Sequence, residues 1–169
     1  MIDAGQPAPS FSAQADDGRV VTLESLRGRS VVLYFYPKDD TPGCTTEACE
    51  LRDAFPRFDG AEATIIGVSP DSVASHQKFK AKFSLPFTLL ADTGHAIAEA
   101  YEVWKEKSMY GRTYMGVERT TFLIDPSGTI AHVWRKVKPE GHAAAVAAVL
   151  PGSVAAPPAP KKRVSKKRA

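Results

Sequence analysis

One buried strand constrains the fold of this chain more than any other feature. Residues 30–36 read SVVLYFY, a β-branched and aromatic run with apolar side chains at both odd and even positions. Because successive side chains point to opposite faces of a strand, this run is apolar on both faces and is typical of the centre of a sheet covered on both sides. Such a strand needs further strands beside it and helices over it. We therefore expect an α/β protein.

The segments after this strand alternate between helical and extended patterns. Apolar residues at helical spacing predict helices over residues 44–58 and 73–83, and β-rich runs predict strands over residues 63–68 and 87–91. A strand, a helix and a second strand in this order form a βαβ crossover, which makes the two strands parallel. A short helix is expected over residues 95–101.

The second half of the chain predicts a hairpin and a final helix. Residues 120–124 and 129–135 are β-rich, and the turn sequence DPSG joins them. An alanine-rich helix is expected over residues 139–150, whereas residues 102–118 are expected to be irregular. Alternating strands and helices that end in a hairpin favour an α/β sandwich around a mixed sheet.

The composition changes at residue 151. Residues 151–169 contain Pro, Ala, Ser and basic residues, no aromatic residue and two branched aliphatic ones. Such a segment cannot offset its ordering entropy by burial. We expect one folded domain over residues 1–150 and a disordered tail over residues 151–169. The net charge of +3 also comes from this tail, because the chain outside residues 161–169 carries 16 basic and 19 acidic residues.

The composition excludes a membrane-spanning protein. Hydrophobic residues make up 43% and charged residues 24% of the chain, and no apolar run approaches the roughly 20 residues of a membrane helix. The opening MIDAGQP lacks the basic start and apolar stretch of a secretory signal. We expect a cytoplasmic location and no membrane association. Two cysteines are too few for a disulfide-stapled fold.

Cys44 is the main candidate for chemistry. It follows a Pro–Gly turn and stands at the predicted first turn of a helix, where free backbone N–H groups and the positive end of the helix dipole converge. This position favours the thiolate, which is the nucleophilic form of cysteine. The alternative is a small buried hydrophobic residue, which is what most free cysteines are.

Cys49 lies five residues later in the same predicted helix. In an intact helix, Cα atoms at this spacing lie about 8.7 Å apart and point about 140° apart. That distance exceeds the roughly 7 Å limit for a disulfide, so a bond to Cys44 requires the first turns to unwind. Metal binding is a weaker alternative, because the cysteines and histidines show neither C-x-x-C nor H-x-x-x-H spacing. Each histidine is interpreted as a surface residue or a satisfied core residue, and no metal is expected.

The residues around Cys44 resemble the active-site signature of the peroxiredoxins. The proline, threonine and cysteine of that signature match Pro37, Thr41 and Cys44 in type and spacing. The longer stretch YFYPKDDTPGCTTEAC at residues 34–49 looks like the peroxiredoxin Q, or bacterioferritin comigratory protein, branch. The resemblance covers about residues 7–150 and continues through three further segments, residues 109–111, 116–125 and 137–142.

The resemblance implies a thioredoxin-like fold, with a central mixed sheet flanked by helices, and a thiol-dependent peroxidase. By resemblance, Cys44 is the peroxidatic cysteine, which attacks hydrogen peroxide or an alkyl hydroperoxide and becomes a sulfenic acid. Cys49 is then the resolving cysteine, which forms an intramolecular disulfide. The family implies that thioredoxin or a similar dithiol reduces this disulfide, and it implies no cofactor. We expect a monomer or weak dimer.

Two further site residues follow from the resemblance. Thr41 is expected to place its hydroxyl near the Cys44 sulfur, accepting from the thiol or donating to the peroxide; the alternative is a turn threonine that bonds local backbone. Arg119 is expected to hold Cys44 as thiolate and to orient the peroxide; the alternative is a surface arginine. Glu47 has the capping-box spacing from Cys44 and is expected to be structural, ordering Arg119.

Two other functions remain as alternatives. A thioredoxin-like thiol-disulfide oxidoreductase would share the fold and the helix-start cysteine, but C-x-x-C is absent and residues 118–121 contain an arginine where those proteins usually have a proline. A nucleic-acid-associated protein would use the basic cluster at residues 161–168, which favours weak contact with phosphates. The mildly acidic body shows no recognition motif for nucleic acid.

Overall fold

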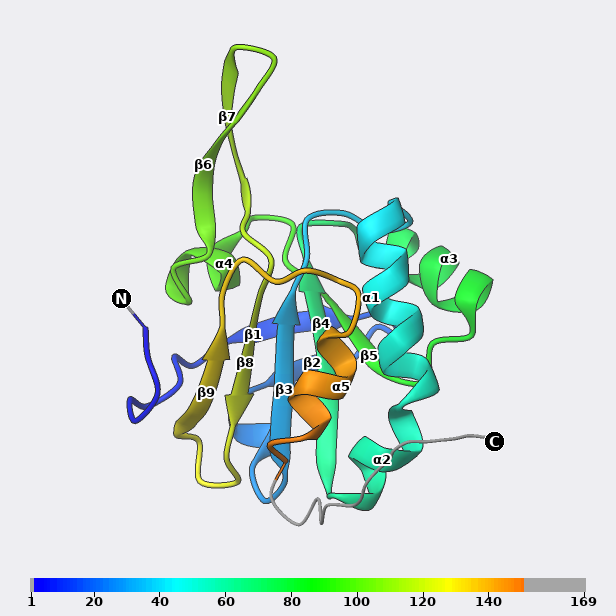
Figure 1. Cartoon of the computed structure of the whole chain (residues 1–169), viewed down its shortest axis with the longest axis vertical. Helices are drawn as coiled ribbons and strands as arrows, with labels where there is room; N and C mark the ends of the chain where they lie inside the picture. Colours follow the sequence, from blue (N-terminus) through cyan, green and yellow to red (C-terminus); the bar gives the residue numbers. More distant parts are fainter. Residues whose placement is uncertain (1, 151–169) are drawn as a thin grey trace.

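The computed structural model describes residues 2–150, so the predicted tail and its basic cluster lie outside the described residues. Seven strands form one mixed sheet in the order β2-β1-β5-β4-β3-β8-β9 (Figure 1). These strands are β1 (Ser12–Ala15), β2 (Val20–Thr22), β3 (Ser30–Phe35), β4 (Ala63–Ser69), β5 (Thr88–Ala91), β8 (Thr120–Ile124) and β9 (Ile130–Trp134). Within residues 2–150, no helix has the length and apolar character needed to cross a membrane.

Strand β3 lies at the centre of the sheet, as its sequence predicts. All six of its residues are buried, and it pairs with β4 in parallel and with β8 antiparallel. Val32 and Tyr34 pack on one face of the sheet, whereas Leu33 and Phe35 pack on the other. The pairing of β4 with β5 is also parallel, which confirms the βαβ crossovers. The N-terminal hairpin β1–β2 was not expected from the sequence.

Most of the helices cover one face of the sheet. Helix α1 packs there together with α2, α3 and α5, and α4 packs on the opposite face, where it joins the second core cluster. The helices are α1 (Pro42–Asp53), α2 (Phe55–Gly60), α3 (Val73–Phe83), α4 (Ala96–Ala100) and α5 (His142–Ala147), and a 3₁₀ turn lies at Glu24–Leu26. This arrangement is the expected mixed sheet flanked by helices (Figure 1).

Two predicted helices differ in length from those observed. The helix expected over residues 44–58 begins earlier, at Pro42, and ends at Asp53, after which α2 forms a separate helix. Pro56 explains the break, because a proline lacks the N–H that would continue the hydrogen-bond ladder and restricts the residue before it. Helix α5 is shorter than the expected 139–150 at both ends. It begins after its N-cap Gly141, which has a positive φ of 80°, and it ends at Ala147.

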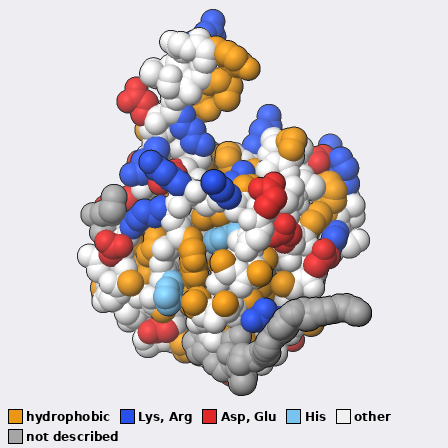
Figure 2. All heavy atoms as spheres, in the orientation of Figure 1, with side chains coloured by type: hydrophobic (Ala, Val, Ile, Leu, Met, Phe, Trp, Pro, Cys, Tyr) orange, Lys and Arg blue, Asp and Glu red, His pale blue; other side chains and the backbone are white. Residues whose placement is uncertain are grey.

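The expectation that residues 102–118 are irregular is wrong. They contain a hairpin of β6 (Trp104–Met109) and β7 (Arg112–Val117), which projects from the body of the molecule (Figure 1). The turn residues Tyr110 and Gly111 both have positive φ, as a tight two-residue hairpin turn requires. Most residues of its two strands are exposed, so buried and exposed residues do not alternate along them. Apolar side chains of the hairpin lie on its exposed surface (Figure 2).

Candidate active site

The register of β3 against β8 brings Arg119 to Cys44. Phe35, the last residue of β3, pairs with Thr120, the first residue of β8. Arg119 directly precedes Thr120, so it lies beyond the same end of β3 as the loop that leads into α1. Two segments far apart in the sequence therefore meet at one end of the sheet.

The first turn of α1 places Cys44 inside this end of the fold. Thr41 is the N-cap with an extended backbone, and Pro42 begins the helix. Cys44 is therefore the third residue of the helix, where the backbone N–H groups are not yet paired within it. Its side chain is 1% exposed. The capping-box interpretation is wrong, because Thr41 and not Cys44 occupies the cap and Glu47 lies a turn further along.

Arg119 contacts both Cys44 and Glu47. Its Nη2 donates to the Cys44 Sγ at 3.3 Å, and its Nη1 donates to the Glu47 Oε1 at 2.6 Å. Burial lowers the pKa of Arg119, but the negative charges of Glu47 and Cys44 outweigh this and raise its pKa above the ordinary value. A guanidinium in this position stays charged and favours the thiolate form of Cys44. Arg119 is therefore not a surface residue, and Glu47 orders it as expected.

Glu47 is an unusual carboxyl group. It is 1% exposed, and burial raises its pKa to about 7 although Arg119 acts in the opposite direction. In the described part of the chain, its Oε2 and the Tyr34 hydroxyl are the buried side-chain polar atoms without a hydrogen-bond partner. The contact with the Arg119 guanidinium thus favours the ionised form of Glu47 against the cost of its burial.

Gly43 leaves room for the guanidinium. A Cβ atom at this position would lie 3.1 Å from the Arg119 Nη2 and 3.4 Å from the Pro139 Cγ. Contacts this short would press Arg119 away from its present position. The sequence does not predict this role of Gly43, because nothing local in a Pro–Gly turn reveals which distant side chain approaches it.

The Thr41 hydroxyl donates to the Lys38 carbonyl at 2.9 Å. This is the local backbone bond of the alternative interpretation, and it uses the single proton of the hydroxyl. Thr41 therefore has lone pairs but no proton to offer to a molecule bound at Cys44. A donor role toward peroxide is incompatible with this geometry, whereas an acceptor role is compatible.

Cys44 and Cys49 are both free thiols in this structure. Both lie within α1, and Cys49 is more accessible than the buried Cys44. Five helical residues separate them by about 8.7 Å at the Cα atoms, so they are not in bonding distance while the helix is intact.

The family of this chain follows from comparison with known proteins. Residues 4–133 match the model of the AhpC/TSA family. The chain belongs to this family. Within it, the chain is 54% identical to peroxiredoxin Bcp of Bacillus subtilis over 143 residues, which cover 85% of this chain and 91% of that protein. It is 43% identical to peroxiredoxin Bcp of Escherichia coli strain K12, over 83% of this chain and 90% of that protein.

Solved structures give the same assignment. The Xanthomonas campestris bacterioferritin comigratory protein, solved in a study of its alkyl peroxide reduction activity, superposes with a TM-score of 0.83 and is 45% identical. The superposition covers 88% of this chain and 97% of that one. The chain is thus a member of the Bcp, or peroxiredoxin Q, branch with the thioredoxin-like fold expected of it.

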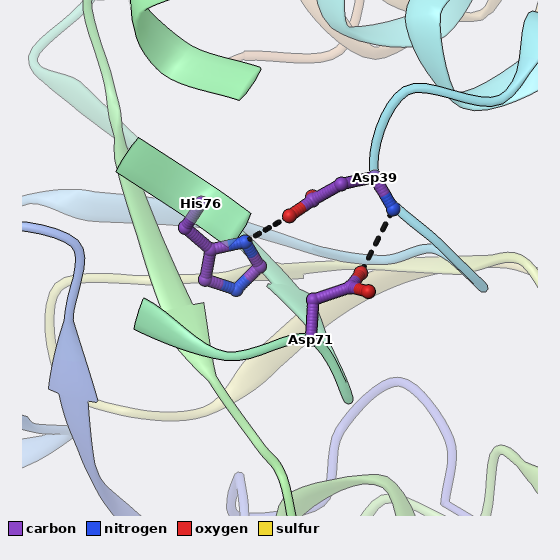
Figure 3. A group of neighbouring side chains, drawn as sticks. All are labelled: Asp39, Asp71 and His76. Carbon is purple, nitrogen blue, oxygen red and sulfur yellow. Dashed lines mark hydrogen bonds and ion pairs between the residues drawn. The ribbon is translucent and has the colours of Figure 1, made fainter. Parts of the chain in front are cut away.

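A cluster of metal-ligand residue types lies beside the loop before α1. Asp39, Asp71 and His76 bring their ligand atoms within 4.8 Å of one another (Figure 3). The two ring nitrogens of His76 each lie 2.8 Å from an oxygen, the Asp39 Oδ2 and the Leu90 carbonyl. Neither nitrogen has a free lone pair directed at an open position, so this cluster does not fit a metal ion. From the sequence, His76 is expected to be a surface residue or a satisfied core residue, and no local pattern connects it with the loop before α1.

Proposed function

We propose that this chain is a thiol peroxidase in which Cys44 reduces hydrogen peroxide or alkyl hydroperoxides. The observation that carries the proposal is the 3.3 Å contact between the Arg119 Nη2 and the Cys44 Sγ. A permanent positive charge beside a buried sulfur at the start of a helix favours the thiolate, and the thiolate is the nucleophile. The names of the relatives and the AhpC/TSA match support the same activity.

In the first step, the Cys44 thiolate attacks the nearer peroxide oxygen. The O–O bond breaks, a sulfur–oxygen bond forms, and the leaving oxygen takes up a proton to give water or an alcohol. The Arg119 guanidinium has N–H groups that can follow the charge as it moves from sulfur to the leaving oxygen. Thr41 accepts a hydrogen bond from the peroxide, since its own proton is held by Lys38. The product on the enzyme is a Cys44 sulfenic acid.

In the second step, the Cys49 thiol condenses with the sulfenic acid. A disulfide forms and one water leaves, which protects Cys44 from further oxidation. The first turns of α1 must open for this bond, because the intact helix holds the two residues too far apart. Helix α1 begins at a loop, and both cysteines lie in the first eight of its 12 residues, so the opening starts from the N-terminal end of the helix.

In the third step, an external dithiol reduces the disulfide by thiol-disulfide exchange. Thioredoxin or a similar carrier suits this role, and a cytoplasmic location would supply it. The reduced protein, with Cys44 and Cys49 as free thiols, is then ready for another turnover. The two thiols provide both electrons of each turnover, so the cycle requires no metal and no organic cofactor.

The intact mass and the number of free thiols after one equivalent of peroxide test this proposal. We expect a loss of 2 hydrogen atoms, about 2 Da, and of both thiols, because one disulfide forms and both peroxide oxygens leave the protein. A mass gain of one oxygen with one thiol left would support the attack of Cys44 on peroxide but would refute Cys49 as the resolving cysteine. An unchanged mass with both thiols free would refute the peroxidase itself.

A further inference from the structure

A buried hydrogen-bond network surrounds Asp39, which lies in the loop between β3 and α1. Asp39 stands two residues before Thr41 and five before Cys44, and it is 7% exposed. Its Oδ1 accepts from the Tyr36 hydroxyl at 2.6 Å. Its Oδ2 accepts from the Ser75 hydroxyl at 2.7 Å and faces the His76 Nδ1 at 2.8 Å (Figure 3). Three donors, one directly after β3 and two from α3, therefore converge on one carboxylate.

The backbone of Asp39 is held as well. Its N–H donates to the Asp71 Oδ2 at 2.8 Å, and the same oxygen accepts from the Ser69 hydroxyl at 2.6 Å. Asp71 belongs to the turn between β4 and α3. The side chain and the main chain of Asp39 are thus attached to β3, to α3 and to the turn after β4.

The hydrogen bonds of His76 determine its protonation. The ring is fully buried, and both nitrogens lie 2.8 Å from acceptors that have no proton to give, the Asp39 carboxylate and the Leu90 carbonyl. A neutral imidazole has only one N–H and would leave one of these contacts without a proton. His76 is therefore a buried imidazolium. Burial lowers the pKa of His76, but the hydrogen bond and charge of Asp39 outweigh this and raise it.

The network lies in the same loop as Thr41. Asp40, between Asp39 and Thr41, has a positive φ of 58°, a conformation that aspartate adopts more readily than most non-glycine residues and that turns the chain sharply between the two. The Thr41 hydroxyl bonds within the loop, to Lys38, and the Asp40 side chain has an exposed bond to Lys82. Asp39 is the buried attachment of this loop to the rest of the fold. Thr41 follows two residues later, whereas α1 is held by its own packing in the core, where Ala48 and Leu51 are buried.

We propose that Asp39 and His76 are positioning residues for the peroxidase reaction, which hold residues 37–41 so that the Thr41 hydroxyl faces a peroxide bound at Cys44. The inference rests on the proposed function of Cys44. Neither residue takes part in bond making. Arg119 comes from a different part of the chain, so the charge beside the sulfur does not depend on this network.

That independence makes the proposal testable. Alkylation of Cys44 by iodoacetamide requires a thiolate but no Thr41 hydroxyl, whereas peroxide reduction requires both. In a Cys49→Ser background, which leaves one thiol, we expect Asp39→Asn and His76→Leu to slow the peroxide reaction about 10- to 100-fold, the cost of a small misplacement in a site. The alkylation rate should change by less than about threefold. Both rates are divided by the concentration of folded protein in each variant.

A graded variant and a matched control separate positioning from stability. His76→Asn retains an N–H donor toward Asp39 and should restore most of the peroxide rate relative to His76→Leu. Asp16→Asn disrupts another buried aspartate that is attached to α3, through Lys80, and to the Leu89 backbone, away from the loop before α1. It should lower the melting temperature without slowing either reaction of the folded protein.

Three outcomes would overturn the inference. The first is that Asp39→Asn and His76→Leu react with peroxide at a rate within threefold of the Cys49→Ser parent. The second is that these variants lose peroxide and alkylation rates equally, which would indicate general damage to the site. The third is a His76→Asn variant no faster than His76→Leu. If the Cys49→Ser parent itself does not react with peroxide, the proposed function of Cys44 fails, and this result differs from all three.

Discussion

The Nη2 atom of Arg119 lies 3.3 Å from the Sγ atom of Cys44, although 75 residues separate the two in the sequence. The contact depends on the pairing of Phe35 with Thr120, which places the start of β8 beside the end of β3. Because Nη1 of the same guanidinium binds Glu47, the two ends of the planar group are both occupied. Arg119 therefore has a fixed orientation toward the sulfur.

Arg119→Lys should slow the reaction of Cys44 with peroxide about 100-fold, the typical cost of removing one well-placed donor from a site where charge develops. A lysine keeps the charge but cannot bind Glu47 and Cys44 with two nitrogens in a plane. Stopped-flow fluorescence in a single turnover measures the rate. Arg29→Lys is the control, since Arg29 binds Asp59 and Thr64 away from the site. An Arg119→Lys rate within threefold of wild type would contradict the role of the guanidinium.

The two cysteine variants should fail at different steps. Cys44→Ser should consume no peroxide at any concentration of reductant, because the nucleophile is missing. Cys49→Ser should complete one fast turnover to a trappable sulfenic acid, then stall with thioredoxin and over-oxidise in excess peroxide. Dimedone trapping and mass spectrometry follow both products. Normal cycling of Cys49→Ser with thioredoxin would show that Cys49 is not the resolving residue.

Oxidation should unwind the first turns of α1. A Cys44 to Cys49 disulfide cannot form across an intact helix, since the Cα atoms lie about 8.7 Å apart there. Hydrogen exchange of residues 43–50 should be faster in the oxidised protein than in the reduced one, whereas exchange in the central strands β3 and β4 should not change. A disulfide between the two cysteines together with unchanged protection of α1 would contradict this prediction.

Gly43→Ala should slow the reaction of Cys44 with peroxide, while two opposing effects act on stability. Alanine in a helix is more favourable than glycine by about 1 kcal/mol. Its Cβ would lie 3.1 Å from the Arg119 Nη2 and displace it from Cys44. The strained contact with Arg119 opposes the gain in helix stability. We expect a peroxide rate lowered about 10-fold in stopped-flow single turnover, a loss of the size that follows a small displacement of a reacting group. An unchanged rate would show that Arg119 tolerates the methyl group without losing its contact.

His142 should destabilise the wild-type protein in acid. Burial, assisted by the charge of Arg119, lowers the pKa of His142 to about 4, whereas its pKa in the unfolded chain is about 6.5. Between these values the unfolded state binds a proton that the folded state does not, so the free energy of unfolding decreases as the pH falls from about 6.5 to 4. The full effect is about 3 kcal/mol.

His142→Gln isolates this effect from other titrating groups. Glutamine can still bond to Thr121, which contacts the His142 Nε2 at 2.8 Å, but it does not titrate. In urea unfolding at pH 8, 6, 5 and 4.5, the stability difference between variant and wild type should shift toward the variant as the pH falls. A difference that is constant across this range would contradict the lowered pKa.

Local patterns in the sequence were enough for the central part of the fold. The run at residues 30–36 predicted a strand buried on both faces, and α3 has the predicted limits of Val73–Phe83. Pro42, Gly43 and Cys44 together indicated the start of a helix with a reactive thiol. These features depend on backbone preferences and on side-chain period within a short segment, which the sequence contains in full.

Local sequence patterns did not predict the β6–β7 hairpin. Its strands expose most of their residues, so burial imposes no alternation, and the residue order alone does not distinguish them from a loop. The turn at Tyr110 and Gly111 was the one local signal. A strand that does not bury one face in a core shows no period-2 pattern of apolar residues, so its sequence does not predict it.

The sequence by itself determined that this is an α/β chain with Cys44 at a helix start and a family signature around it. The tertiary structure decided which residues meet there: the β3–β8 register brought Arg119 to the sulfur, and the packing of α3 brought His76 to Asp39. The physical reason is that a contact between distant segments depends on strand order and register. These are fixed by the packing of the whole core and not by the residues that finally touch.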